Sequence, residues 1–248
     1  MLDTEYIRSC LVINLGLTPY RAAWDLQRRV VAARKANKVP DVLLLCEHPH
    51  VITLGRNGKP EHLRTSPDLL RQMNVEFHQT DRGGDITYHG PGQLVGYPIL
   101  NLAAICRDVV WYVRQLEEAM IRATAEFGIP ATRLPGKTGV WVQRPGSEDE
   151  KLAAIGVHIS RWVTSHGFAY NVATDLRYFD LIVPCGIPDK RPTSLERLLS
   201  RRVDVAELVP RIVARLGQVF DRDMRWARRE ELEELLRVGE QEFAGATA

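Results

Sequence analysis

The sequence predicts an α+β fold with a mixed central sheet flanked by helices. Two observations favour this class: short β-rich runs are concentrated in the middle of the chain, and long helical patterns lie between and after them. The chain has 248 residues, of which 45% are hydrophobic and 26% charged, and this is ordinary globular composition. A chain of this length can bury a sizeable core without the help of disulfides or a structural metal.

The first half of the chain begins with a β-rich run at residues 10–15 and continues with a helical pattern over residues 19–37. In that helix the apolar residues recur at helical spacing, and Pro19 marks its start. The last of the four β-rich runs that follow is separated from the third by a segment rich in glycine. These four runs lie at residues 42–47, 51–55, 75–80 and 94–99.

The second half contains the longest helical pattern, residues 107–127, for which Gly128 is a plausible end. Strand patterns follow at residues 140–143, 152–160 and 167–172, and helical patterns at residues 195–199, 205–220 and 230–238. The sequence contains no internal repeat or low-complexity linker. We therefore expect a single domain over residues 1–248, with a helical C-terminal tail from about residue 193.

Charge and cysteine usage exclude several classes of protein. With 33 basic and 31 acidic side chains the net charge is only +2, which does not favour nucleic acid as a partner. Two early acidic residues and the lack of an apolar region argue against a secretory signal, and no apolar run approaches the roughly 18 residues of a membrane span. The cysteines lack the spacing of zinc or redox motifs, so we expect a reduced, cytoplasmic setting. They are Cys10, Cys46, Cys106 and Cys185.

The segment at residues 82–93, RGGDITYHGPGQ, contains four glycines and a proline, so it cannot form a helix. It is either a tight turn between strands or a loop that lines a site, and its Arg, Asp, Thr and His favour the site. It lacks the G-x-G-x-x-G pattern of dinucleotide-binding loops. Gly136-Lys137-Thr138 resembles the end of a phosphate-binding loop, but Ala131 stands where the first glycine should be.

Two residues are candidates for covalent chemistry. Cys185 lies between Pro184 and Gly186, where a loop could present its thiol to a substrate. A nearby cation would lower the thiol pKa from about 8.5 and favour the nucleophilic thiolate. Lys151, at the head of a strand of small residues, could supply this charge. Both residues also have an ordinary interpretation: Cys185 as a small apolar residue in a turn, and Lys151 as a solvated surface charge. Sequence spacing alone does not place the two side by side.

A metal site is not expected. Cys46, His48 and His50 alternate, but the His-Pro-His run interrupts the strand and no second pair of residues has ligand spacing.

Seven stretches, in this order, resemble the lipoyl/octanoyl transferases, a family also called lipoate-protein ligase B. Any one of them is weak evidence, but together they span over half of the chain and are highly specific. Position 158 is the one mild difference, because His158 stands where Arg or Lys is common in the family. The stretches are EHP at 47–49, TLGR at 53–56, RGGDITYHGPGQL at 82–94, GVWV at 139–142, KLAAIGV at 151–157, HGFAYNV at 166–172 and PCGI at 184–187.

The resemblance implies the fold of the biotin and lipoate protein ligase catalytic domain. It also implies that Cys185 carries an acyl thioester and that Lys151 lowers the pKa of its thiol. His89 and nearby backbone amides are then candidates to stabilise an oxyanion. The same match assigns the substrate contacts to Arg82, Gly83, Gly84, Asp85, Ile86, Thr87, Tyr88, His89, Ala154, Ile155, Gly156, Gly167, Phe168 and Ala169.

The family's reaction moves an octanoyl or lipoyl group from acyl carrier protein to a lysine of a lipoyl domain, in 2-oxoacid dehydrogenases or the glycine cleavage H protein. Because the donor thioester is already activated, we expect no cofactor and no ATP. An ATP-dependent lipoate or biotin ligase on the same fold is the nearest alternative, although it would have no use for Cys185. A non-catalytic carrier-binding protein and a cysteine hydrolase are two further alternatives.

Overall fold

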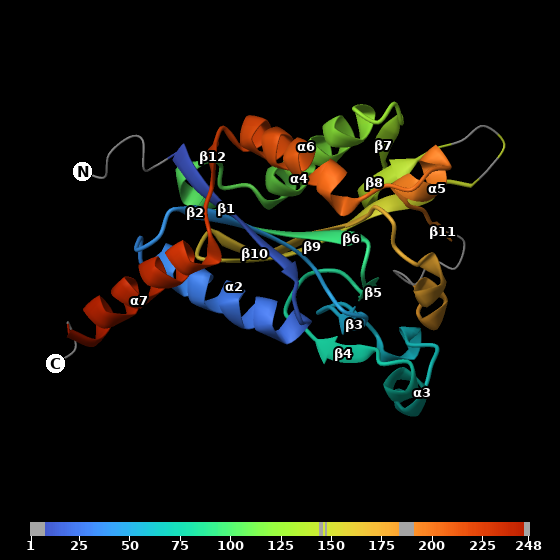
Figure 1. Cartoon of the computed structure of the whole chain (residues 1–248), viewed down its shortest axis with the longest axis horizontal. Helices are drawn as coiled ribbons and strands as arrows, with labels where there is room; N and C mark the ends of the chain where they lie inside the picture. Colours follow the sequence, from blue (N-terminus) through green and yellow to red (C-terminus); the bar gives the residue numbers. More distant parts are fainter. Residues whose placement is uncertain (1–7, 144–145, 147, 184–190, 246–248) are drawn as a thin grey trace.

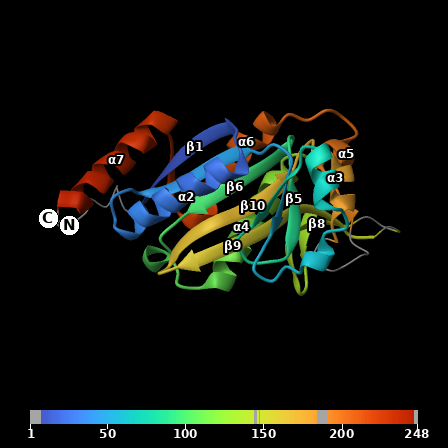
Figure 2. The ribbon, with the colours of Figure 1, turned by 90° about the horizontal axis from the view of Figure 1, so that it is seen from below.

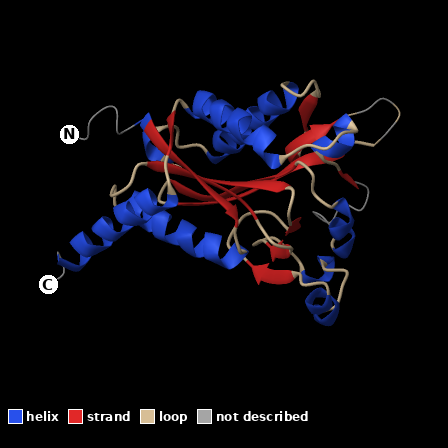
Figure 3. Cartoon of the chain, in the orientation of Figure 1, coloured by secondary structure: helices blue, strands red, loops and turns tan. Residues whose placement is uncertain are grey.

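The computed structural model describes residues 8–143, 146, 148–183 and 191–245, so Cys185 and the predicted Pro-Cys-Gly loop lie outside the described residues. A twisted sheet runs through the middle of the molecule, with helices above and below it (Figures 1 and 3). Parallel and antiparallel strand pairs occur in the same sheet. The predicted class, a mixed sheet flanked by helices, is therefore confirmed.

The main sheet has the order β12-β1-β2-β6-β10-β9-β8-β7, and β11 pairs with β9 outside this path. β1 is parallel to β2 and β12, and β11 is parallel to β9, whereas the other neighbours are antiparallel. The strands are β1 (Ser9–Leu17), β2 (Asp41–Glu47), β6 (Gln93–Ile99), β7 (Ala131–Leu134), β8 (Lys137–Val142), β9 (Glu150–Ser160), β10 (Val163–Asn171), β11 (Arg191–Pro192) and β12 (Asp223–Trp226).

Helices cover both faces of this sheet (Figures 1 and 2). On one face lie α4 (Val109–Ala125) and α6 (Val205–Phe220), with the short α5 (Leu195–Leu199) near one end; on the other lie α2 (Tyr20–Lys35) and α7 (Arg229–Gly245). Within the described residues, no helix combines the length and apolar character that a membrane crossing needs.

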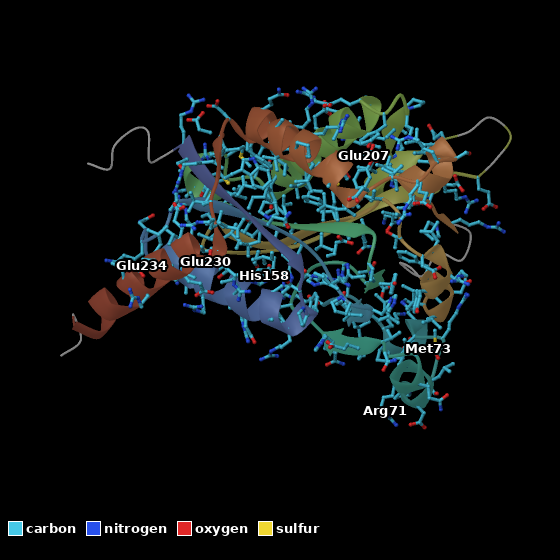
Figure 4. All side chains as sticks on the ribbon, in the orientation of Figure 1. Arg71, Met73, His158, Glu207, Glu230 and Glu234 are labelled. Carbon is cyan, nitrogen blue, oxygen red and sulfur yellow. The ribbon has the colours of Figure 1, made fainter. Side chains whose placement is uncertain are left out.

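Each helix layer encloses its own core, because successive residues of a strand point to opposite faces. In β2, Leu43 and Leu45 pack with α4 and α6, while Val42 and Leu44 pack with α2. Figure 4 shows side chains filling both spaces between the sheet and the helices. Strands buried on both faces are continuously apolar, which explains the run of leucines in β2.

A second, three-stranded sheet lies below one end of the main sheet (Figure 1). Its order is β4-β3-β5, and together with helix α3 it encloses a third small core. These elements are β3 (Val51–Leu54), β4 (Glu76–Gln79), β5 (Ile86–His89) and α3 (Pro67–Gln72); three short 3-10 helices, η1 (Pro60–His62), η2 (Leu102–Ala104) and η3 (Leu176–Leu181), complete the connections.

The sequence patterns miss several short elements, α3, β5, β7, β11 and β12 among them, and two of the strands show why. β5 lies inside the glycine-rich segment, where antiparallel pairing with β3 holds Ile86 to His89 extended. β12 lies inside the predicted helical tail, where parallel pairing with β1 makes Asp223–Trp226 the edge strand. Both are four-residue strands, and pairing with a distant segment, which local patterns do not reveal, stabilises them.

Candidate active site

A cavity of about 540 Å³ lies between the main sheet and the glycine-rich segment. Of the predicted substrate contacts, all except Tyr88 line it. Tyr88 is buried in the core of the small sheet, where its hydroxyl lies 2.7 Å from Nδ1 of His50 and its ring stacks on Tyr178. The structure therefore brings together three stretches that are far apart in the sequence: residues 82–89, 154–156 and 167–169.

Small residues on two neighbouring strands form the floor of the cavity. Strands β9 and β10 are antiparallel, and their register pairs Gly156 with Gly167 and Ala154 with Ala169. A Cβ on Gly167 would lie only 2.1 Å from the carbonyl oxygen of Gly96, so this position excludes any side chain. The result is a floor lined with small residues, over which an apolar chain can lie.

The glycine-rich segment is fixed to the rest of the fold by hydrogen bonds. The Gly83 N–H donates to the carbonyl of Val157 on β9 at 2.8 Å. The Arg82 guanidinium donates to the carbonyl and hydroxyl oxygens of Thr53 at 2.7 and 2.8 Å, and to the Gly83 carbonyl at 3.0 Å. Arg82 is 7% exposed, so these bonds form in a largely dry environment and hold the wall of the cavity in one shape.

A buried polar chain connects His89 to the strand that carries Lys151. Nδ1–H of His89 donates to Oε1 of Gln93 at 2.8 Å, and the Gln93 amide donates to Oδ1 of Asn171 at 2.9 Å. The Asn171 amide donates to the Thr193 carbonyl at 3.0 Å, and the Thr193 N–H donates to the Lys151 carbonyl at 2.9 Å. Gln93 and Asn171 were not singled out from the sequence, although polar residues within otherwise apolar strands could have identified them.

Burial and the hydrogen bond to Gln93 together determine the protonation state of His89. Burial, followed by the nearby His48 and Arg82, lowers the pKa of His89 to about 3, so the imidazole is neutral at physiological pH. Because Nδ1 carries the proton that Gln93 accepts, Nε2 is an acceptor. In this geometry Nε2 of His89 carries no proton to donate, and a role for His89 or the nearby backbone amides in stabilising an oxyanion stays a prediction.

Lys151 lines the cavity from β9, and its side chain lies against an aromatic ring. Its Nζ is 5.0 Å from the ring centroid of Trp141 on β8, and Nζ of Lys137 is 5.8 Å from the same centroid. The register between β8 and β9 shifts at this point, because Val140 pairs with Ala153 but Trp141 pairs with Lys151. One extra residue in β9 is a β-bulge, a feature that re-aims side chains next to active sites.

The thiol of Cys46 is buried in β2 beside two polar side chains. Its Sγ is 3.5 Å from Nε2 of His48, which also lies 2.7 Å from the Tyr97 hydroxyl. Burial, followed by Glu47, raises the Cys46 pKa far above its ordinary value, and burial lowers the His48 pKa to about 4. Cys46 is only 1% exposed, and a buried cysteine whose thiol pKa is raised is typical of a structural role.

Comparison with known proteins agrees with this geometry. The family profile of the lipoyl protein ligase A/B catalytic domain matches residues 19–217. An octanoyltransferase from Solibacter usitatus is 50% identical over 218 residues, which cover 88% of this chain and 96% of the relative. Another, from Koribacter versatilis, is 50% identical over 228 residues, covering 91% and 89%. The chain belongs to the octanoyltransferase family. The resemblance inferred from the sequence motifs is thereby confirmed.

A solved structure shows the family fold at lower identity. The bipartite lipoate protein ligase from Thermoplasma acidophilum, studied with its E2 lipoyl domain, superposes with a TM-score of 0.71 at 18% identity and covers 93% of this chain and 91% of its own. The expected lipoate-ligase fold is therefore confirmed as well.

In this member of the octanoyltransferase family, the residues described before Cys185 are bonded to a neighbour of the cavity wall, and those described after it reach the cavity. The Val183 N–H donates to the His62 carbonyl at 2.7 Å. Beyond Cys185, β11 pairs Pro192 with Lys151, and Pro192 also lines the cavity.

Proposed function

We propose that the chain transfers an octanoyl group from octanoyl-acyl carrier protein to a lysine of a lipoyl domain, through a thioester on Cys185. The observation that carries this proposal is the cavity, which has a floor of small residues and the Lys151 side chain in its lining. Its volume of about 540 Å³ lies within the range of about 300–1,000 Å³ that is usual for small-molecule sites. Family membership supplies the identity of the acyl group.

The chemistry requires two acyl transfers. The thiolate of Cys185 attacks the donor thioester carbonyl, a new acyl–sulfur bond forms, and the bond from the acyl carbon to the carrier sulfur breaks. The carrier leaves as a thiol after taking a proton from the Lys151 ammonium, which becomes a free amine. The amine of the target lysine then attacks the Cys185 thioester, an amide forms, and the Cys185 thiolate is released as the amine loses a proton. Lys151 as ammonium favours the thiolate, and as free amine it accepts that proton. Covalent catalysis of this kind gives ping-pong kinetics.

The position of the flanking residues supports the pairing of Cys185 with Lys151. Val183 is tied to His62, whose side chain bonds Asp85 of the cavity wall at 2.6 Å. On the other side, Pro192 pairs with Lys151 itself.

The partners that we propose are acyl carrier protein as donor and, as acceptors, the lipoyl domains of 2-oxoacid dehydrogenases and the glycine cleavage H protein, all in the cytoplasm. Arginines that follow Cys185 in the sequence could attract an acidic carrier. Two of them already have acidic neighbours, since Arg197 lies 3.1 Å from Glu150 and Arg201 lies 3.0 Å from Glu207, which Figure 4 labels on α6. Arg191 and Arg202 are exposed and are the stronger candidates.

Intact mass measurement after mixing with octanoyl-acyl carrier protein tests the proposal. The wild-type protein and Cys106→Ser, a change at a half-buried cysteine, should gain one octanoyl group, whereas Cys185→Ser should gain none and should lose transfer. Near-normal turnover by a folded Cys185→Ser protein would refute the role of Cys185. The ATP-dependent alternative predicts pyrophosphate exchange with free octanoate, which the proposed mechanism does not support.

A further inference from the structure

Glu117 is a buried carboxylate that the proposed reaction does not use. It lies on α4, its side chain is 0% exposed, and its Oε1 accepts the N–H of Gly139 on β8 at 2.9 Å. Its Oε2 lies 2.7 Å from Nη1 of Arg114 and 3.1 Å from Nε of Arg133. A carboxylate is rarely buried unless it is paired, so this arrangement has a specific cause.

Gly139 lies directly against the Lys151 side chain. Its φ is +123°, and a Cβ built on it would be 2.8 Å from Cε of Lys151 and 3.5 Å from Nζ. The same Cβ would be 2.5 Å from the carbonyl oxygen of Ala153. The bare backbone of Gly139 therefore forms the surface on which the aliphatic part of Lys151 rests, and any shift of this backbone changes the space available to the ammonium group.

The hydrogen bond from Gly139 to Glu117 takes the place of a strand contact. Val140 with Ala153 is the last registered pair between β8 and β9, and Gly139 lies beyond it. At this end of the two strands a side chain of α4 accepts the Gly139 N–H. Glu117 thus holds β8 where the bulge in β9 directs Lys151 toward the ring of Trp141.

We infer that Glu117 is a positioning residue for Lys151, which acts by holding the Gly139 backbone in the conformation that supports the lysine side chain. The inference rests on the catalytic role proposed for Lys151. The effect is expected to depend on the length of the Glu117 side chain, which brings its oxygen to the Gly139 N–H, and not on its negative charge. Arg114 and Arg133 are 45% and 33% exposed, so water can solvate them when the carboxylate is replaced.

Two conservative substitutions separate the effect of side-chain length at Glu117 from the effect of its charge. Glu117→Gln keeps the length of the side chain and an oxygen acceptor but removes the charge. Glu117→Asp keeps the charge but withdraws the acceptor by roughly 1.5 Å, the length of one carbon–carbon bond. Glu118→Gln is the matched control, because the adjacent Glu118 pairs with Arg122 and Arg133 but lies outside the Gly139 contact.

The readouts are kcat and KM for octanoyl transfer, the pH dependence of Cys185 alkylation by iodoacetamide, and thermal unfolding, with Lys151→Ala as reference. We expect Glu117→Asp to lower kcat by about 10- to 100-fold with little change in KM, since a misplacement near 1 Å has this effect. Its alkylation curve should move in the same direction as that of Lys151→Ala. Glu117→Gln and Glu118→Gln should stay close to wild type in both measurements.

The reverse order, with Glu117→Gln impaired and Glu117→Asp active, would show that the charge matters and would overturn the inference. A lower unfolding temperature in Glu117→Asp with unchanged kcat and alkylation would show a purely structural residue and would overturn it too. If Lys151→Ala shifts both readouts and Glu117→Asp shifts neither, only the inference fails. If Lys151→Ala itself shifts neither, the proposed role of Lys151 fails with it.

Discussion

Gly156 determines how closely the glycine-rich segment approaches β9, and a larger side chain there should displace that segment. A Cβ on Gly156 would lie 2.9 Å from the carbonyl oxygen of Gly83 and 3.1 Å from Cδ of Arg82. The first of these atoms belongs to the backbone and cannot swing aside. Gly156→Val must therefore lift the segment and strain the bond from the Gly83 N–H to the Val157 carbonyl.

The expected loss of stability in Gly156→Val follows from these contacts. Overpacking of this kind costs about 1–3 kcal/mol, and the loss of one hydrogen bond costs about 0.5–1.5 kcal/mol. For a chain of this length each kcal/mol lowers the unfolding temperature by roughly 2–4 °C, so a decrease on the order of 10 °C is expected. Because the cavity wall itself moves, octanoyl transfer should fall for donors of every chain length.

Ala154→Val is the matched comparison. Ala154 lies two residues earlier on the same face of β9, is half-buried and lines the cavity, so added carbons occupy the acyl slot. Each buried methylene contributes about 0.8 kcal/mol. If two carbons of the chain are excluded, the eight-carbon donor loses roughly 1.6 kcal/mol, or about 15-fold in kcat/KM, while shorter donors are spared.

The two effects are distinguished by measuring acyl transfer with donors of about four to fourteen carbons, together with thermal unfolding, for both variants. This range includes donors shorter and longer than eight carbons, so the contribution of each buried methylene can be read from the series. A Gly156→Val protein with wild-type unfolding temperature and a shifted chain-length optimum would refute the argument that the glycine-rich segment rests on Gly156. A flat wild-type profile would show that the slot has no closed end.

Three further outcomes are expected. Lys151→Ala should raise the pKa of the Cys185 thiol, so that alkylation requires higher pH, and superimposable curves for wild type and variant would contradict this. Asn171→Ala leaves two buried polar groups without their partner and should cost about 2–6 kcal/mol in urea unfolding; a cost below about 0.5 kcal/mol would contradict the buried chain. The pKa values of His48 and His89 are lowered to about 4 and about 3, so the unfolded state binds more protons below pH 6.5. Stability should then fall as the pH decreases from about 6.5 toward 4, by up to about 1.4 kcal/mol per pH unit for each histidine, and a His48→Gln protein should show a shallower slope.

The elements that the sequence predicted correctly are those whose pattern is local. β2 is apolar at nearly every position because both of its faces are buried, and α4 repeats its apolar residues at helical spacing over seventeen residues. The elements that it missed depend on distant partners. β7 has four residues and forms by pairing with β8, in the same way as β5 forms with β3. Pairing with a distant segment supplies most of the energy that stabilises such short strands, so their own few residues do not predict them.

The residues of the site also differ in how well the sequence reveals them. Motif residues such as Lys151 are readable in the sequence because their neighbours are distinctive, whereas Glu117 is one of two adjacent acidic residues in an amphipathic helix and carries no signal of its own. Helix geometry points the two side chains about 100° apart, and packing then leaves Glu117 0% exposed and Glu118 28% exposed. Only Glu117 reaches Gly139, across 22 residues of sequence. The two glutamates therefore have the same chemistry but different contacts, so a difference between their variants in the kinetics of transfer reports the contact itself.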